Sequence, residues 1–448
     1  MVTVPGGGTL YTNGIGTATQ TILGNAIQTL VAGNTGLANA TVQTLTVPGG
    51  SVVQALASNT IAQVNVTPTT SGGTVDLGQV TGSGTAIVTL NAASTVGSQV
   101  VLSAAPNAAP ILLALNDASN TVTGGAGDAT IVGGAGNLVF STPTVGGGSA
   151  DIVTGTGRAT VAAASGNNTI TASGTASSIA LGGGNNQVTV TGASATVVGG
   201  AGNATMVGGS GNALFATAAS GGGHTEIVTG TGASSVVASS GSNTVVAGGS
   251  SIVGVTGGAN IIGAESSSNA QIFLAAGSNT VFGGTNSTIA GGSGNQTVIG
   301  GSGDVILAGN NSGNLLVAGA GSETVSGSNS SGNNTFITGS GNTLINQMGS
   351  GNDTITAGTG NATVWAGTGH DVFGFFSGSQ TNGATGGGTT ALGNFGANDT
   401  LAISGYGLSA SQILANAKVS GGSTTISLQD GTKIILAGFT NLTASSLV

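Results

Sequence analysis

Few residues of this chain could take part in chemistry, and two aspartates that lie 18 residues apart, Asp353 and Asp371, are the most suggestive. The 448 residues include 12 acidic side chains, 3 basic side chains, 2 histidines and no cysteine. One histidine, His224, lies two residues before Glu226, and the other, His370, directly precedes Asp371. Polysaccharide-cleaving enzymes need grouped carboxylates, and nucleic-acid sites need grouped cations. These groups are scattered here, so we expect no enzyme, no nucleic-acid binding and two surface histidines.

The elements that must position the aspartates are glycine-rich repeats with a step of nine residues. The pattern is G-G-x-G-N/D-x-x-φ-x, where φ is apolar. The eighth position holds Ile131, Phe140, Met206, Phe215, Val298, Leu307, Ile355, Val364 and Phe373. This spacing predicts one inward side chain on each short strand, with glycine in the turns. Two repeats then form one coil, and successive coils stack around a thin continuous core.

Composition favours such stacked β layers over an ordinary globular domain. Charged residues make up 3% of the chain, whereas soluble domains contain about a quarter. A hydrophobic share of 38% argues against disorder. There is no run of 18 apolar residues, so we expect no transmembrane helix. Because residues 1–6 contain neither a basic nor an apolar run, we expect no N-terminal export signal.

The repeat resembles the glycine-rich nonapeptide of RTX (haemolysin-type) proteins, whose parallel β-roll binds calcium through an aspartate at the sixth position. The resemblance implies an all-β fold, a right-handed parallel β-solenoid (β-roll) with a β-rich N-terminal region and a small C-terminal β cap. Most copies have lost the aspartate. Their sixth positions hold Ala129, Leu138, Ala204, Ala213, Gln296, Val305 and Ala362.

Asp353 and Asp371 keep the family's residue in adjacent coils. The resemblance therefore implies one calcium ion bound by Asp353 and Asp371, with the turn residues Gly351 and Gly369 completing an oxygen shell. The alternative is two exposed remnants that accept hydrogen bonds from turn amides. Two further aspartates occupy the fifth position, which does not ligate in the family pattern, and we expect them to face solvent: Asp128 and Asp304.

Asparagine takes the sixth position in four looser copies, at Asn168, Asn243, Asn279 and Asn334. Stacked in successive coils, these side chains could form a hydrogen-bonded ladder of amides that needs no metal.

The chain is expected to have three parts: a β-rich region at 1–115, the solenoid at 116–376 and a C-terminal cap at 377–448. The first part could be irregular coils or a small packed β domain. In the last part the sequence predicts a strand at 398–405, a helix at 409–417 with Ser409 as its N-cap, and a hairpin that turns at Asp430-Gly431. From His370 to Val448 the chain resembles the uncleaved C-terminal region of type I secreted RTX proteins.

These features predict an extracellular or cell-surface structural protein that self-assembles, head-to-tail or laterally, into a filament, surface layer or biofilm matrix. Its partners would be copies of itself, the type I export machinery and cell-surface polysaccharide. The alternative is a surface-binding module, an adhesin that binds glycan or ice through Thr-x-Thr runs at 169–171, 189–191 and 354–356. Those runs do not follow one sustained register in the sequence.

Overall fold

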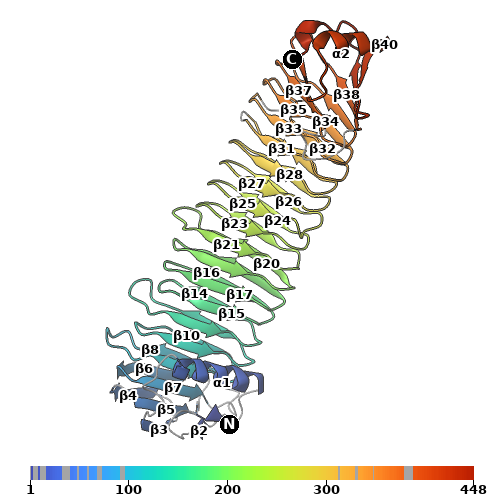
Figure 1. Cartoon of the computed structure of the whole chain (residues 1–448). Coiled ribbons are helices and arrows are strands. Elements are labelled where there is room, and N and C mark those ends of the chain that lie inside the picture. Colours follow the sequence, from blue (N-terminus) through green and yellow to red (C-terminus); the bar gives the residue numbers. More distant parts are fainter. Residues whose placement is uncertain are drawn as a thin grey trace. The chain divides into compact units, whose positions relative to one another are not determined.

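The computed structural model describes residues 2–3, 9–10, 17–32, 41–47, 50–57, 60–67, 73–90, 96–310, 313–327, 331–346, 348–377 and 387–448. The chain forms two compact units, Met1–Gly232 and Ala233–Val448. Each unit is a parallel β-solenoid in which short strands stack coil upon coil (Figure 1), which confirms the predicted fold class. From β3 to β39 the odd-numbered strands form one sheet in each unit, the odd sheet, and the even-numbered strands form the other, the even sheet, which β40, β41 and β42 also join.

The first unit begins with a short antiparallel pair and one helix, and all its later elements are strands. Its elements are β1 (Val2–Thr3), β2 (Thr9–Leu10), α1 (Thr17–Ala32), β3 (Thr41–Val47), β4 (Gly50–Leu56), β5 (Thr60–Val66), β6 (Gly73–Gly82), β7 (Thr85–Leu90), β8 (Ser98–Leu102), β9 (Ile111–Ala114), β10 (Asn120–Thr123), β11 (Ala129–Val132), β12 (Leu138–Ser141), β13 (Ala150–Val153), β14 (Ala159–Ala163), β15 (Thr169–Ala172), β16 (Ser177–Leu181), β17 (Asn186–Val190), β18 (Ser194–Val198), β19 (Ala204–Val207), β20 (Asn212–Ala216) and β21 (Thr225–Val228).

The strands before residue 116 belong to the same solenoid as those that follow. β5 pairs in parallel with β7, β7 with β9, and β9 with β11, so the strands from β3 to β9 form coils of this solenoid. The helix α1 was not expected from the sequence. It buries Leu23 and Ile27, whose i,i+4 spacing places both side chains on one face of the helix.

The second unit continues the two-sheet pattern and ends in the predicted cap. Its elements are β22 (Ser235–Ala238), β23 (Thr244–Val246), β24 (Ile252–Val255), β25 (Ile261–Gly263), β26 (Gln271–Leu274), β27 (Thr280–Phe282), β28 (Thr288–Ala290), β29 (Thr297–Ile299), β30 (Val305–Leu307), β31 (Leu315–Val317), β32 (Glu323–Ser326), β33 (Thr335–Ile337), β34 (Thr343–Asn346), β35 (Thr354–Thr356), β36 (Ala362–Trp365), β37 (Val372–Phe376), β38 (Thr389–Gly393), β39 (Thr400–Ser404), α2 (Ala410–Asn416), β40 (Lys418–Ser420), β41 (Ser423–Ser427), β42 (Lys433–Ala437) and the 3₁₀ helix η2 (Ala444–Ser446).

The core of each unit is a column of inward side chains in strict register. In the second unit Phe336, Ile355 and Phe373 follow one another on neighbouring strands and are buried. The eighth-position prediction is confirmed at every residue except Leu307, which is 41% exposed, while Ile306 is buried in its place. The half-coil that ends at this strand is one residue short, which shifts the inward position by one.

The C-terminal cap has the elements that the sequence predicts. The Ser409 side chain accepts a hydrogen bond from the backbone N–H of Gln412, whose side chain in turn accepts one from the backbone N–H of Ser409, and Ile413 is buried. β41 and β42 pair as an antiparallel hairpin whose turn contains Gly431 with a positive φ of 88°. Both sheets extend into this region, because β38 pairs in parallel with β36, and β39 with β37.

Candidate metal centre

A buried column of amide and carboxyl side chains runs along the odd sheet of the second unit. Each member stands directly before a strand, so it occupies the end of the turn in its coil. We call this column the polar ladder. Its members are Asn243, Asn260, Asn279, Gln296, Asn314, Asn334, Asp353, Asp371 and Asp399, and none is more than 5% exposed.

One hydrogen-bonding rule links most of the polar ladder. The side-chain oxygen of one residue accepts both the backbone N–H and the side-chain N–H of the preceding residue. Asn260 Nδ2 donates to Asn279 Oδ1 over 2.8 Å, and Asn314 Nδ2 donates to Asn334 Oδ1 over 2.9 Å. In the first unit Asn168 and Asn186 follow the same rule, with an Nδ2–Oδ1 distance of 2.9 Å. The predicted ladder of amides is confirmed.

The three carboxylates of the polar ladder follow one another in successive coils. Asp353 N donates to Asp371 Oδ1 over 2.9 Å, and Asp371 N donates to Asp399 Oδ1 over 3.0 Å. Asp353 and Asp371 are therefore neighbours, as the sequence predicts. The alternative of exposed remnants is wrong in their exposure, because each residue is only 1% exposed, although Asp371 Oδ2 does accept a hydrogen bond from the turn amide of Gly367.

The turns beside these carboxylates are packed too closely for side chains. A Cβ added to Gly369 would lie 1.9 Å from the carbonyl oxygen of Gly351, and one added to Gly351 would lie 2.2 Å from the carbonyl oxygen of Gly332. Glycine at these turns therefore lets the backbones of successive turns approach closely, with each carbonyl oxygen against the glycine of the next coil.

Two of the carboxylates resist ionisation. Burial raises the pKa of Asp353 to about 6, the charge of Asp371 adds to the rise, and hydrogen bonds from Asn334 oppose it. Burial also raises the pKa of Asp371, and the charge of Asp399 acts in the same direction. Asp353 Oδ2 is buried without a hydrogen-bond partner.

A hard cation that prefers oxygen ligands fits this chemistry, because it would satisfy the unpartnered oxygen and offset the charge of neighbouring carboxylates. The donor set is linear. In the described part of the chain no three His, Cys, Asp or Glu side chains gather closely enough to enclose a metal ion. A calcium ion here would therefore draw on two successive carboxylates and on turn carbonyls such as those of Gly351 and Gly369.

Asp399 was missed by the sequence analysis, although a signal was present. The tetrapeptide Asn398-Asp399-Thr400-Leu401 repeats the pattern of Asn352-Asp353-Thr354-Ile355. Asp399 lies 28 residues after Asp371 instead of 18, and this longer interval hid the match.

The other acidic residues and histidines divide between surface and interior. Asp128, His224 and His370 are exposed, as predicted. The prediction that Asp304 faces solvent is wrong. It is fully buried in the even sheet, where its two carboxylate oxygens accept hydrogen bonds from the backbone N–H groups of Ser287 and Gly301, each over 2.7 Å. The same one-residue shift that turns Leu307 outward places Asp304 in the inward sixth position.

Comparison with known protein families agrees with the geometry. RTX calcium-binding nonapeptide repeats match in four copies at residues 116–137, 290–327 and 349–373, the last of which contains Asp353 and Asp371. No curated protein sequence matches the chain. Within the described residues, no helix is long and apolar enough to cross a membrane. Repeats of this kind typically bind calcium, and proteins that carry them are generally secreted by type I export. The chain thus carries RTX calcium-binding nonapeptide repeats that form a parallel β-solenoid.

Proposed function

We propose that this protein is a secreted, non-enzymatic structural subunit that self-assembles outside the cell into a filament, surface layer or matrix. The observation that carries the proposal is an uncharged row of apolar residues on the outer face of the even sheet in the second unit. Val237, Phe273 and Leu307 are each more than 40% exposed on alternate strands of one outward register position, and Gly254 and Ala290 lie between them. A row of apolar groups of this kind favours contact with another protein surface over contact with water.

Little charge is available to prevent such contact. Between residues 233 and 376 there is no lysine or arginine, and the acidic residues are Glu265, Asp304, Glu323, Asp353 and Asp371. All of these except Glu265 are buried. Charged edges and faces are what natural β proteins use to avoid association, and their scarcity supports lateral or head-to-tail assembly.

Calcium has a limited role in this proposal. One ion at Asp353 and Asp371, with Gly351 and Gly369 contributing turn carbonyls, would fix the C-terminal coils of the polar ladder. Asp399 would extend the same carboxylate column by one coil. The remaining coils of the second unit are joined by amides, which need no metal.

Electron microscopy and light scattering of the purified protein test the assembly. We expect polymers that persist at pH 4 and in molar salt, because their contacts would not depend on ion pairs. Phe273→Lys and Leu307→Lys should abolish them through like-charge repulsion. Ile261→Lys, at an apolar residue that is 50% exposed on the odd sheet, is the matched control and should still assemble. A wild-type protein that stays monomeric at high concentration, with calcium and with chelator, would overturn the proposal.

A surface-binding module is the second candidate, and one observation favours it. Thr280, Thr297, Thr335 and Thr354 share one outward register position of the odd sheet, interrupted only by Leu315. The threonine register in the second unit is thus more regular than the sequence suggested. A monomeric protein that adsorbs to a solid surface through these threonines would support this function instead.

A further inference from the structure

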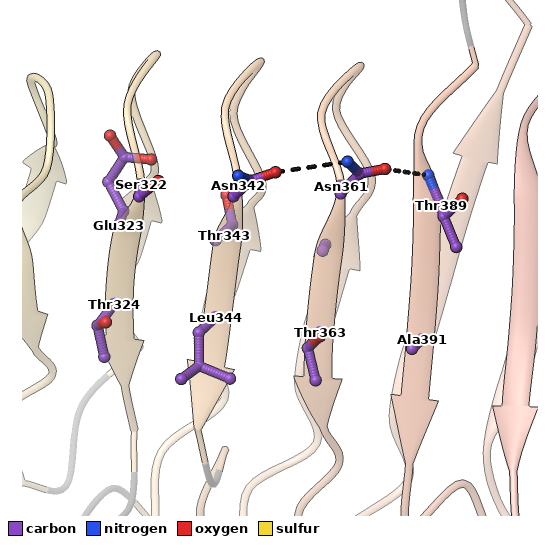
Figure 2. Close-up of a pocket in the computed structure, with 11 residues that line it drawn as sticks. Ser322, Glu323, Thr324, Asn342, Thr343, Leu344, Asn361, Thr363, Thr389 and Ala391 are labelled. Carbon is purple, nitrogen blue, oxygen red and sulfur yellow. Dashed lines mark hydrogen bonds between the residues drawn. The ribbon is translucent and has the colours of Figure 1, made fainter.

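A shallow groove of about 600 Å³ crosses the outer face of the even sheet near its C-terminal end. Its floor is a row of side chains in register on β32, β34, β36 and β38: Thr324, Leu344, Thr363 and Ala391. Figure 2 shows this row, with the turns that carry Asn342 and Asn361 along one margin. Hydroxyl, amide and methyl groups therefore recur from strand to strand, about 4.8 Å apart.

The margin of the groove is ordered by hydrogen bonds between exposed groups. Asn361 Nδ2 donates to Asn342 Oδ1 over 3.4 Å, and Thr389 N donates to Asn361 Oδ1 over 3.0 Å (Figure 2). These contacts hold the amides in place at the surface, where they retain donor and acceptor capacity for a ligand.

The single tryptophan of the chain lies beside this floor. Trp365 is two residues beyond Thr363 on β36, so it projects from the same face about 7 Å further along the strand. It is 44% exposed. Its indole lies against Gly393 on the neighbouring strand, where an added Cβ would be 2.6 Å from a ring carbon. Glycine at this position thus leaves the space in which the ring rests on the sheet.

The charge around the groove is low. Glu323 lines it but is 2% exposed, and its Oε1 accepts hydrogen bonds from the backbone N–H groups of Gly321 and Gly303. Its Oε2 is buried without a hydrogen-bond partner, so the Glu323 carboxyl group does not present a charge at the groove surface. Lys433, which pairs in register with Thr389, and Lys418 on β40 are exposed cations at this end of the sheet, and neither lines the groove.

We propose that this groove binds a neutral, hydroxyl-rich polysaccharide, with Trp365 as its stacking platform. Sugar rings present an apolar C–H face that suits an aromatic ring, and hydroxyl groups that suit amides and threonine. A row of equivalent groups on successive strands fits a polymer of repeating units. The absence of a cation in the groove itself matches a ligand without carboxylate or sulfate groups. The proposal does not depend on self-assembly.

Affinity electrophoresis through gels that contain dextran, mixed-linkage β-glucan or alginate tests the binding. We expect one of the two neutral glucans to retard the wild-type protein, and the same glucan to shift the fluorescence of Trp365. Trp365→Ala should weaken retardation by about tenfold or more, as removal of a central aromatic anchor does. Trp365→Phe should retain part of the binding, and Gly393→Val should lose it because the added side chain displaces the indole.

Ile261→Ala is the control, because this exposed apolar residue lies on the odd sheet, outside both the groove and the apolar row of the even sheet, and its loss should leave retardation unchanged. The circular dichroism of each variant reports whether the solenoid is intact. Equal retardation of Trp365→Ala and wild type, or no retardation by either neutral glucan, would overturn the proposal. Retardation by alginate alone, abolished by Lys433→Ala, would also overturn it, in favour of an acidic glycan. Electron microscopy of Trp365→Ala shows whether this variant still forms polymers, and so separates a loss of polysaccharide binding from a loss of self-assembly.

Discussion

At the scale of single residues, the unpartnered oxygen of Asp353 makes stability depend on pH. Its pKa in the folded state is about 6, above the ordinary value of 3.8, so the folded state binds this proton more tightly than the unfolded state. In chelator, the stabilisation is fully present below pH 3.8 and is lost as the pH rises to about 6. We expect the metal-free protein to melt at a higher temperature at pH 4 than at pH 7.

Asp353→Asn should remove this dependence. The new amide could accept from Asn334 and donate to Asp371 Oδ1, as the asparagines of the polar ladder do. In chelator at pH 7 we expect its melting midpoint to rise by a few degrees, measured by circular dichroism. Glu265→Gln, at an exposed carboxylate of the same unit, should leave the midpoint unchanged. A lower midpoint for Asp353→Asn in chelator would contradict this prediction, because it would show that the buried carboxylate does not destabilise the folded state.

At the scale of elements, the C-terminal strands, helix and hairpin close both sheets and resemble a type I secretion region. Removal of all residues after Leu401 would take away most of β39 together with α2, β40, β41, β42 and η2. We expect the shortened protein to remain inside the producing cell, as measured by immunoblotting of cells and medium. Ser409→Ala removes only the helix cap and should still be exported. Normal amounts of the shortened protein in the medium would contradict this prediction.

The regular elements could be predicted because each depends on local chemistry. An apolar residue once per nine identifies the inward face of a strand, and Asp430-Gly431 and Ser409 mark the hairpin and the helix start. The helix α1 could not be found in this way, because its apolar spacing is weak beside the surrounding β-rich sequence. Insertions and deletions in turns change the number of residues between successive strands but leave the strands in register. A search for a fixed spacing of nine residues therefore missed Asp399 and predicted the wrong orientation for Leu307.

At the scale of the whole molecule, coil-to-coil bonding by amides predicts a fold that is largely independent of calcium. In excess chelator we expect the circular dichroism spectrum to retain its β character. Hydrogen exchange should accelerate only around β35, β37 and β39, where carboxylates replace amides. A protein dependent on calcium throughout, as an array rich in sixth-position aspartates would be, should instead collapse to a coil spectrum.

The polar ladder also has a direction. Asn243, Asn260 and Asn279 each donate toward the C-terminal side, and Asn260 and Asn279 also accept from the N-terminal side, so their amide dipoles align. The stack is electrically polarised along its length, with its positive pole toward Asp353, much as a helix is polarised along its axis. Acceptor-only side chains are best tolerated at that pole, because an aspartate in the middle would break the relay of donors. The order of amides and acids along the chain therefore has one favourable direction, because the reverse order would place the carboxylates at the negative pole of the stack.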